Sequence, residues 1–174
     1  MGAARECVLD RALVGNDSFD DFYRRHRLRL VGLAYAISGS RLGADDLVHD
    51  VMERAYRDWD QIRSRDDPAL WVRRMVANRS VSAYRRRAAE ARAVARLALR
   101  ADQATFPQPG AETEWIWGEV RRLPARQAQV VALTYVEQLT MSEVGEVLGC
   151  SKESVNTHLR RARDTLAHRL GLEV

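Results

Sequence analysis

A row of polar and basic side chains near the carboxyl end of the chain has the types and spacing needed to read duplex DNA. Asn156 can make a bidentate contact with adenine, Arg160 can do so with guanine, and Thr157 can touch a base edge or a methyl group. The segment 151–154 stands where a helix N-terminus would meet a phosphate group. The predicted DNA contacts are Ser151, Lys152, Ser154, Asn156, Thr157, Arg160 and Arg161.

The sequence predicts two short helices that would hold this row against DNA. Thr140 and Glu143 have the spacing of a capping box, which marks the start of the first helix. Gly149 ends that helix, and Ser151 can cap a second one whose apolar side chains recur at helical spacing. Two helices joined by a short turn with a glycine are typical of a helix-turn-helix, whose second helix lies in the major groove. A plain helical hairpin with a basic exposed face is the alternative.

Charge is distributed unevenly along the chain. Residues 71–100 hold nine Arg and one acid, whereas residues 44–60 hold six acids and two Arg. A basic segment and an acidic segment on one chain indicate two different partners, one polyanionic and one cationic. Two solvated helix faces are the alternative interpretation, since the net charge is only +4.

Apolar side chains recur at helical spacing in almost every segment, so the predicted fold class is all-α. Helix starts are expected at Ser18, at Asp67-Pro68 and at Leu123-Pro124. Residues 98–112 contain Gly110, two prolines and no apolar periodicity, which is typical of a flexible linker. We therefore expect an unassigned extension (1–17), a first helical domain (18–97), a linker (98–112) and a second helical domain with the helix-turn-helix (113–174).

Several classes of protein have no support in the residues. Cys7 and Cys150 are isolated and the four His are scattered, so neither a disulfide framework nor a metal site is expected. The chain shows no nucleophile–base pairing and no Gly-rich phosphate loop, so we expect no catalytic residue, no cofactor and no enzyme. The start lacks the pattern of a signal peptide, and no apolar run is long enough to span a bilayer. A cytoplasmic protein without membrane insertion is the expectation.

Three motifs together resemble the extracytoplasmic-function (ECF, group 4) sigma factors of bacterial RNA polymerase. The stretch from Pro124 to Leu170, with Glu143-Val-Gly-Glu-Val-Leu-Gly-Cys-Ser151, resembles their minus-35 reading domain. A similar helix-turn-helix occurs in LuxR-type regulators, so this match alone does not decide. The segment 44–56 resembles the part of a sigma factor that docks on polymerase, and residues 71–79 with 84–87 resemble the part that melts the minus-10 element.

The resemblance implies partners and site residues. The second domain would read the minus-35 element and meet the beta flap of core RNA polymerase. The beta-prime clamp helices would face Asp46, His49, Asp50 and Glu53. The minus-10 element of promoter DNA would be melted and held by Arg63, Arg65, Asn78, Arg79, Tyr84, Arg85 and Arg86. Trp71 is expected in the core, and an anti-sigma factor is a further partner common in the family.

Two alternatives stay open from the sequence. A stand-alone LuxR-type regulator would bind DNA without polymerase, although such proteins usually carry an α/β domain that is not visible here. A decoy sigma factor would dock on polymerase without melting DNA. Transcription in vitro separates this decoy from an active sigma factor.

Overall fold

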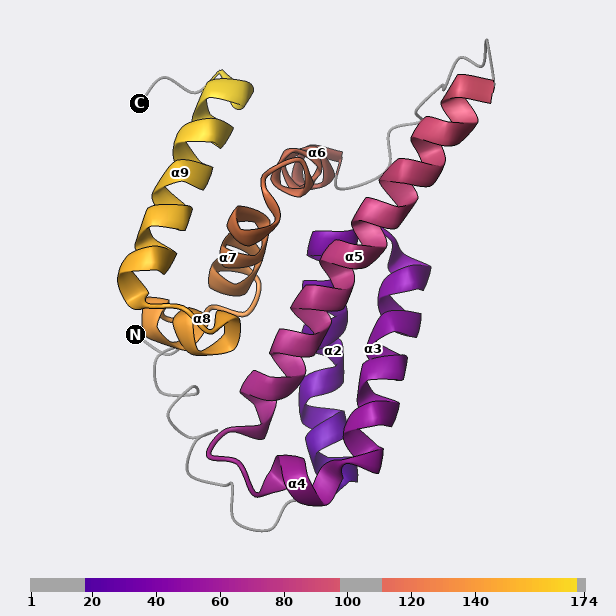
Figure 1. Ribbon diagram of the computed structural model, residues 1–174, viewed down its shortest axis with the longest axis vertical. Helices are drawn as coiled ribbons and strands as arrows, with labels where there is room; N and C mark the ends of the chain where they lie inside the picture. Colours follow the sequence, from indigo (N-terminus) through magenta and orange to yellow (C-terminus); the bar gives the residue numbers. More distant parts are fainter. Residues whose placement is uncertain (1–17, 98–110, 172–174) are drawn as a thin grey trace.

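The structure, a computed structural model, describes residues 18–97 and 111–171, and all regular structure in these two ranges is helical (Figure 1). This confirms the predicted all-α fold class. The extension 1–17 and residues 98–110 of the predicted linker lie outside the described residues. The helices are α2 (Phe19–Ser38), α3 (Arg41–Arg57), α4 (Trp59–Arg63), α5 (Pro68–Leu97), α6 (Ala111–Arg121), α7 (Ala125–Tyr135), α8 (Met141–Leu148) and α9 (Lys152–Leu170).

Hydrogen bonds of the capping side chains confirm the predicted helix starts at Ser18 and Asp67-Pro68, whereas α7 begins at Ala125 after Pro124 without a side-chain cap. Ser18 precedes α2, and its hydroxyl oxygen accepts from the backbone N–H of Asp21 at 3.3 Å. Asp67 precedes α5, and its carboxylate accepts from the backbone N–H of Ala69 at 2.8 Å. Pro68 is the first residue of α5, where its missing N–H costs no helical hydrogen bond. These caps position the basic helix α5 and the helix on which it packs.

Helices α2, α3 and α5 lie side by side and share one apolar core, and the short α4 joins α3 to α5 (Figure 1). The largest fully buried side chains of this N-terminal domain are Leu33, Ile37, Val48, Val51, Met52, Ile62, Val72 and Val76. Burying each of them stabilises the fold by about 1.5–3 kcal/mol. Trp71 is half-buried against the same core, in agreement with the prediction.

The C-terminal domain is built from α6 to α9, and α8 and α9 form the predicted helix-turn-helix. The hydroxyl oxygen of Thr140 accepts from the backbone N–H of Glu143, whose carboxylate accepts from the backbone N–H of Thr140 at 2.7 Å. Gly149 ends α8 in the left-handed region with φ of 67°. Ser151 caps α9, accepting from the backbone N–H of Ser154 at 3.2 Å. The capping box, the glycine and the second cap are thus confirmed.

Gly145 allows α8 to approach the turn that follows it. A Cβ atom at this position would lie 2.6 Å from the carbonyl oxygen of Cys150, closer than real contacts allow. The backbone N–H of Cys150 also donates to the carbonyl oxygen of Gly145 at 2.9 Å. The helix-turn-helix therefore needs a glycine here, and the local sequence pattern does not indicate this requirement.

The two helical domains lie directly against each other. Helices α6 and α7 contact α2, and α7 and α8 contact α5 (Figure 1). The sequence predicts two domains but no contact between them. Helix α6 begins at Ala111, so the end of the stretch predicted as linker is helical.

We predict that Gly145→Ala destabilises the protein by about 1–3 kcal/mol, because the added methyl group forces the turn away from α8. Urea unfolding followed by circular dichroism measures this change. Gly118→Ala in α6 is the matched control, since nothing lies within 4 Å of its added Cβ. That variant should be stabilised by about 0.4–1 kcal/mol through its restricted unfolded chain. Equal stabilities of the two variants would contradict the assignment of Gly145.

Candidate functional site

The exposed face of α9 carries most of the predicted DNA-reading residues. The helix buries Val155, Leu159 and Ala162 against the domain. The opposite side leaves Lys152, Asn156, Arg160 and Arg161 exposed, and the first three stand at steps of four on one stripe. An exposed stripe of donors opposite a buried apolar face has the arrangement that a major groove requires. The individual DNA contacts stay a prediction.

Side chains of α9 and its cap already interact with the N-terminal end of this helix. The hydroxyl of Ser151 lies 3.2 Å from that of Ser154, and the hydroxyl of Thr157 donates to the carbonyl oxygen of Glu153 at 2.9 Å. The pKa of Glu153 is lowered, first by a hydrogen bond from its own backbone N–H and then by the Ser151 hydroxyl. A charged carboxylate therefore competes with a phosphate group for this end of the helix.

The four residues predicted to bind polymerase share the exposed side of α3. Asp46, His49, Asp50 and Glu53 are all exposed and recur at steps of three and four, so they lie on one face of the helix. The structure thus brings them together, as expected for a docking surface. Their contact with polymerase stays a prediction.

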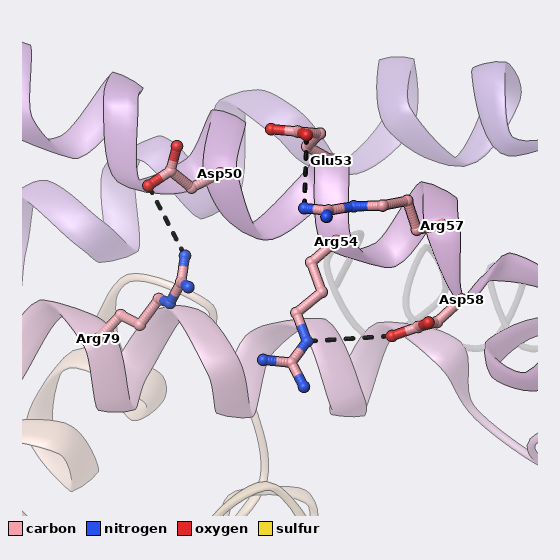
Figure 2. A pocket seen from close by; sticks show the side chains of 6 residues that line it. All are labelled: Asp50, Glu53, Arg54, Arg57, Asp58 and Arg79. Carbon is pink, nitrogen blue, oxygen red and sulfur yellow. Dashed lines mark ion pairs between the residues drawn. The ribbon is translucent and has the colours of Figure 1, made fainter.

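A charged groove runs between α3 and α5 (Figure 2). Across it, Asp50 Oδ2 lies 3.8 Å from Arg79 Nη1, so a predicted polymerase contact meets a predicted minus-10 contact. On α3 itself, Glu53 pairs with Arg57 at 3.4 Å. Such exposed pairs typically contribute less than about 1 kcal/mol, so these side chains are held only weakly.

Five of the predicted minus-10 residues fall in two separate groups, one before α5 and one far along it. Arg63 and Arg65 are exposed near the turn before α5, whereas Tyr84, Arg85 and Arg86 lie far along the helix. From residue 68 to residue 85 the helix rises roughly 25 Å, so the two groups cannot form one cluster. Tyr84 is half-buried, and both arginines after it are exposed.

Asn78, another predicted minus-10 residue, contacts the C-terminal domain. Gln129 of α7 donates from Nε2 to the side-chain oxygen of Asn78 at 2.9 Å. Asn78 nevertheless keeps an exposed surface. One predicted DNA contact on α5 is therefore also a contact between the two domains.

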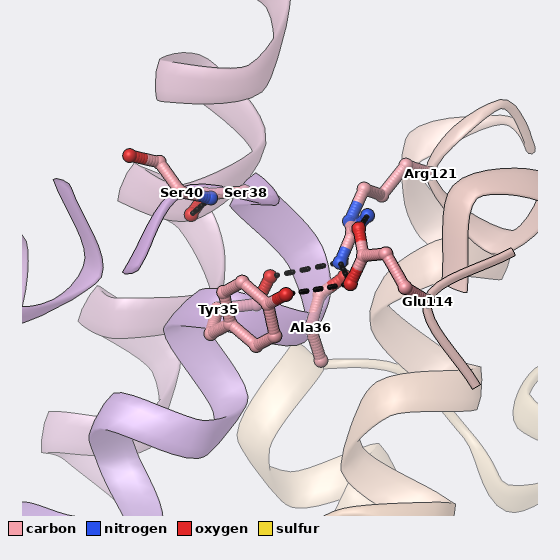
Figure 3. Close-up of polar contacts among 6 residues, drawn as sticks. All are labelled: Tyr35, Ala36, Ser38, Ser40, Glu114 and Arg121. Carbon is pink, nitrogen blue, oxygen red and sulfur yellow. Dashed lines mark hydrogen bonds and ion pairs between the residues drawn. The ribbon is translucent and has the colours of Figure 1, made fainter. Parts of the chain in front are cut away.

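Arg121 of α6 holds the C-terminal end of α2 (Figure 3). Its buried guanidinium donates to the carbonyl oxygens of Ala36 at 2.9 Å and Tyr35 at 3.4 Å. It also pairs with Glu114, which accepts from the Tyr35 hydroxyl at 2.6 Å. A cation at the end of a helix is favoured by the helix dipole and by the unpaired carbonyl groups there.

Arg73 and Arg74 of α5 make the second set of contacts between the domains. Arg73 Nε lies 2.8 Å from Glu137 Oε2, and the two side chains are 9% and 1% exposed. Arg74 donates to the carbonyl oxygens of Val147 at 2.6 Å and Glu146 at 3.0 Å, in the last turn of α8. These roles could not be predicted from the sequence, because the partners of the two arginines lie more than sixty residues away along the chain.

Two family models match the chain: Sigma-70 region 2 at residues 22–90 and Sigma-70, region 4 at residues 113–166. The chain is similar to the ECF RNA polymerase sigma factor SigM of Mycobacterium tuberculosis (strain ATCC 25618 / H37Rv), with 29% identity over 157 residues, 88% of this chain and 78% of that protein. It is also similar to SigW of Bacillus subtilis (strain 168), with 22% identity over 167 residues, 88% of this chain and 89% of that protein. The chain belongs to the ECF sigma factor family.

Solved structures share the fold of this ECF sigma factor. CnrH, in complex with the cytosolic domain of CnrY, has a TM-score of 0.68 at 22% identity, covering 95% of this chain and 99% of that chain. The sigma factor RpoE, in complex with the anti-sigma factor NepR from Bartonella quintana, has a TM-score of 0.65 at 20% identity, covering 88% and 99%.

Family membership confirms the main prediction from the sequence. The protein is a sigma factor that directs transcription initiation by RNA polymerase. The alternative of a stand-alone LuxR-type regulator has no support, since region 2 matches as well as region 4. Among the described residues, no three His, Cys, Asp or Glu side chains gather as a metal site would require, and no helix there is long and apolar enough to cross a membrane.

We predict that the Glu114 contact between the domains weakens in acid. Burial alone would raise the pKa of Glu114, but hydrogen bonds from Arg121 and Tyr35 and the charges of Arg121 and Arg41 lower it below the ordinary value. A lowered pKa in the folded protein stabilises it above the ordinary pKa, and this stabilisation is lost as the pH falls through the lowered value.

Urea unfolding between about pH 7 and about pH 3 measures this dependence. The difference in unfolding free energy between the parent protein and Glu114→Gln should shrink as the pH falls. A difference that stays constant over this range would contradict the prediction. Glu90→Gln, at an exposed position on α5, is the control.

Proposed function

We propose that this ECF sigma factor reads a promoter with two separate surfaces, the exposed face of α9 and the basic helix α5. The exposed stripe of Lys152, Asn156 and Arg160 on the second helix of a helix-turn-helix carries the proposal. These side chains suit hydrogen bonds to base edges in the major groove of the minus-35 element. The order of the two domains follows the region 2 and region 4 matches.

Core RNA polymerase is the proposed partner of α3. Its exposed Asp46, Asp50 and Glu53 suit a basic surface, which in the family is the beta-prime clamp helices. Complementary charge there would steer assembly, while apolar contacts around it supply affinity. The C-terminal domain would meet the beta flap.

The minus-10 element is the proposed partner of α5 and the turn before it. Exposed arginines along the helix can neutralise phosphate groups, and this part of the binding free energy depends on salt. A base removed from the stack needs a stacking surface and nearby cations. Tyr84, half-buried beside Arg85 and Arg86, offers both, and Arg63 and Arg65 would hold the strand farther along.

Two further properties are proposed from the family. The protein would act without a catalytic centre of its own, because polymerase performs the chemistry. It would be held by an anti-sigma factor in the cytoplasm. CnrH and RpoE, the structural neighbours, were solved in complexes with CnrY and the anti-sigma factor NepR.

Run-off transcription with core polymerase on a genomic library, followed by sequencing of the start sites, tests the whole proposal. An active sigma factor should yield start sites that share two upstream elements. A decoy sigma factor would bind core polymerase and yield no transcripts, and this outcome would contradict the proposal.

We predict that Asp50→Arg weakens binding to core polymerase by about tenfold or more, because it puts a cation against the basic partner. A pull-down with purified core enzyme measures the change. Asp20→Arg, at an exposed position on α2, makes the same change in charge on a different helix and should bind normally. Unchanged binding of Asp50→Arg would remove α3 as the docking surface.

We predict that Arg160→Ala costs about 1–3 kcal/mol of binding free energy at the cognate minus-35 element. Competition binding of holoenzyme to cognate and altered elements measures it. Arg29→Ala, at an exposed position of α2, removes the same charge and should leave the preference unchanged. If Arg160→Ala weakened binding to all sequences equally, Arg160 would contact phosphate and not bases.

A further inference from the structure

Tyr135, the last residue of α7, holds an arginine of α9 on the surface of the C-terminal domain. Its hydroxyl oxygen accepts from Nη2 of Arg163 at 2.8 Å and from Nε of the same side chain at 3.1 Å. Both residues are exposed, and Tyr135 is 53% exposed. Helices α7 and α9 lie side by side, so a contact between two helices fixes a side chain that would otherwise be mobile in solvent (Figure 1). Neither residue is among the DNA contacts predicted from the sequence.

The contact leaves one edge of the Arg163 guanidinium available. An arginine side chain carries five N–H donors in a planar fork. Nε and Nη2 each direct one N–H at the phenol oxygen, whereas Nη1 has no hydrogen-bond partner among the described residues. The edge formed by the remaining N–H groups matches two oxygens of a phosphate, which arginine binds in a bidentate manner.

The partner of Arg163 is a neutral phenol, which orients the guanidinium without neutralising its charge. Other arginines of this domain are held by carboxylates, Arg121 by Glu114 and Arg169 by Glu119. Arg163 forms no ion pair with any carboxylate in the described part of the chain. A cation that keeps its full charge suits a phosphate contact, because such a contact gains affinity from the counterions it releases.

Arg163 continues the stripe of α9 that is proposed to enter the major groove. Asn156, Arg160 and Arg163 follow one another at steps of four and three. In a helix-turn-helix, the N-terminal residues of the second helix contact the base edges. From Lys152, the first residue of α9, to Arg163 the helix rises roughly 16 Å, more than the width of the major groove of about 12 Å. Arg163 therefore stands past the base edges, where the sugar–phosphate backbone lies.

We propose that Arg163 binds a backbone phosphate beside the minus-35 element, and that Tyr135 is a positioning residue that holds the guanidinium in place for it. The inference rests on the proposed function of α9. It assigns Arg163 to affinity and not to sequence preference, because a phosphate contact carries no sequence information. Fixing the side chain before DNA arrives reduces the entropy that is lost on binding.

Binding of holoenzyme to promoter DNA at several salt concentrations tests the role of Arg163. Arg163→Ala should bind about tenfold more weakly, and equally so on cognate and altered minus-35 elements. Its slope of log affinity against log salt should be shallower by about one. Arg169→Ala removes the same charge from the last turn of the same helix, where a carboxylate already pairs with it, and should leave affinity and slope unchanged.

Tyr135→Phe tests the positioning role, because it removes the acceptor and keeps the arginine. Affinity should fall by about threefold while the salt slope stays that of the parent protein. Tyr23→Phe, on α2 in the other domain, removes a hydroxyl elsewhere and should bind normally. Tyr135→Phe combined with Arg163→Ala should bind no more weakly than Arg163→Ala alone, because Tyr135 acts only through the arginine.

Several results would overturn the proposal. An unchanged salt slope for Arg163→Ala would show that Arg163 does not bind a phosphate, and a loss confined to the cognate element would make it a base reader. Unchanged affinity of Tyr135→Phe, or additive losses in the double variant, would show that the tyrosine does not act through Arg163. If Arg163→Ala does not fold by circular dichroism, Arg163→Gln replaces it and must meet the same expectations.

Failure of this inference is distinguishable from failure of the proposed function. Run-off transcription by the parent holoenzyme tests the function without reference to Arg163. Normal transcription from promoters with a shared minus-35 element, together with an unchanged Arg163→Ala, refutes the phosphate contact alone. A parent holoenzyme that directs no transcription refutes the proposed function itself.

Discussion

The burial of charge between the two domains is the constraint that positions one domain on the other. Arg73 and Glu137 are almost fully removed from water, and this is tolerated only when the guanidinium and the carboxylate meet in good geometry. Arg121 imposes the same requirement near α2, where its buried guanidinium must meet the carbonyl groups that end the helix. Apolar burial is non-directional, so by itself it would define the relative orientation of the two domains less well. The two arginine contacts come from opposite domains, so each domain supplies donors to the other.

The charged pairs that face solvent contribute little to stability, in contrast to the buried ones. Pairs such as Asp50–Arg79 and Glu53–Arg57 are exposed and contribute little to stability. Breaking them therefore costs little when a charged partner arrives. A buried set of charges that holds the domains together and an exposed set that stays exchangeable both occur on α5. The proposed sigma factor functions depend on the exposed set.

Much of the fold and of the DNA-reading site could be predicted because its determinants are local. Thr140 and Glu143 are three residues apart, and Gly149 and Ser151 mark the turn, so short-range hydrogen bonding alone indicates the helix-turn-helix. The exposed stripe on α9 could be predicted because Val155 and Leu159, at helical spacing, form the buried face and leave the other side of the helix to solvent. The need for glycine at position 145 could not be predicted. It comes from the carbonyl oxygen of Cys150, which approaches this position only after the turn has formed.

The sequence by itself determined the helices, their caps, the charge of α3 and α5, and the resemblance to sigma factors that the comparisons confirm. These follow from periodicity and from contacts within a few residues. Only the tertiary structure decided that Arg73 meets Glu137, that Arg74 and Arg121 each cap a helix of the other domain, and that Asn78 faces Gln129. These partners are between 51 and 86 residues apart. No local pattern specifies such a pairing, since it depends on how two separately folded cores come together.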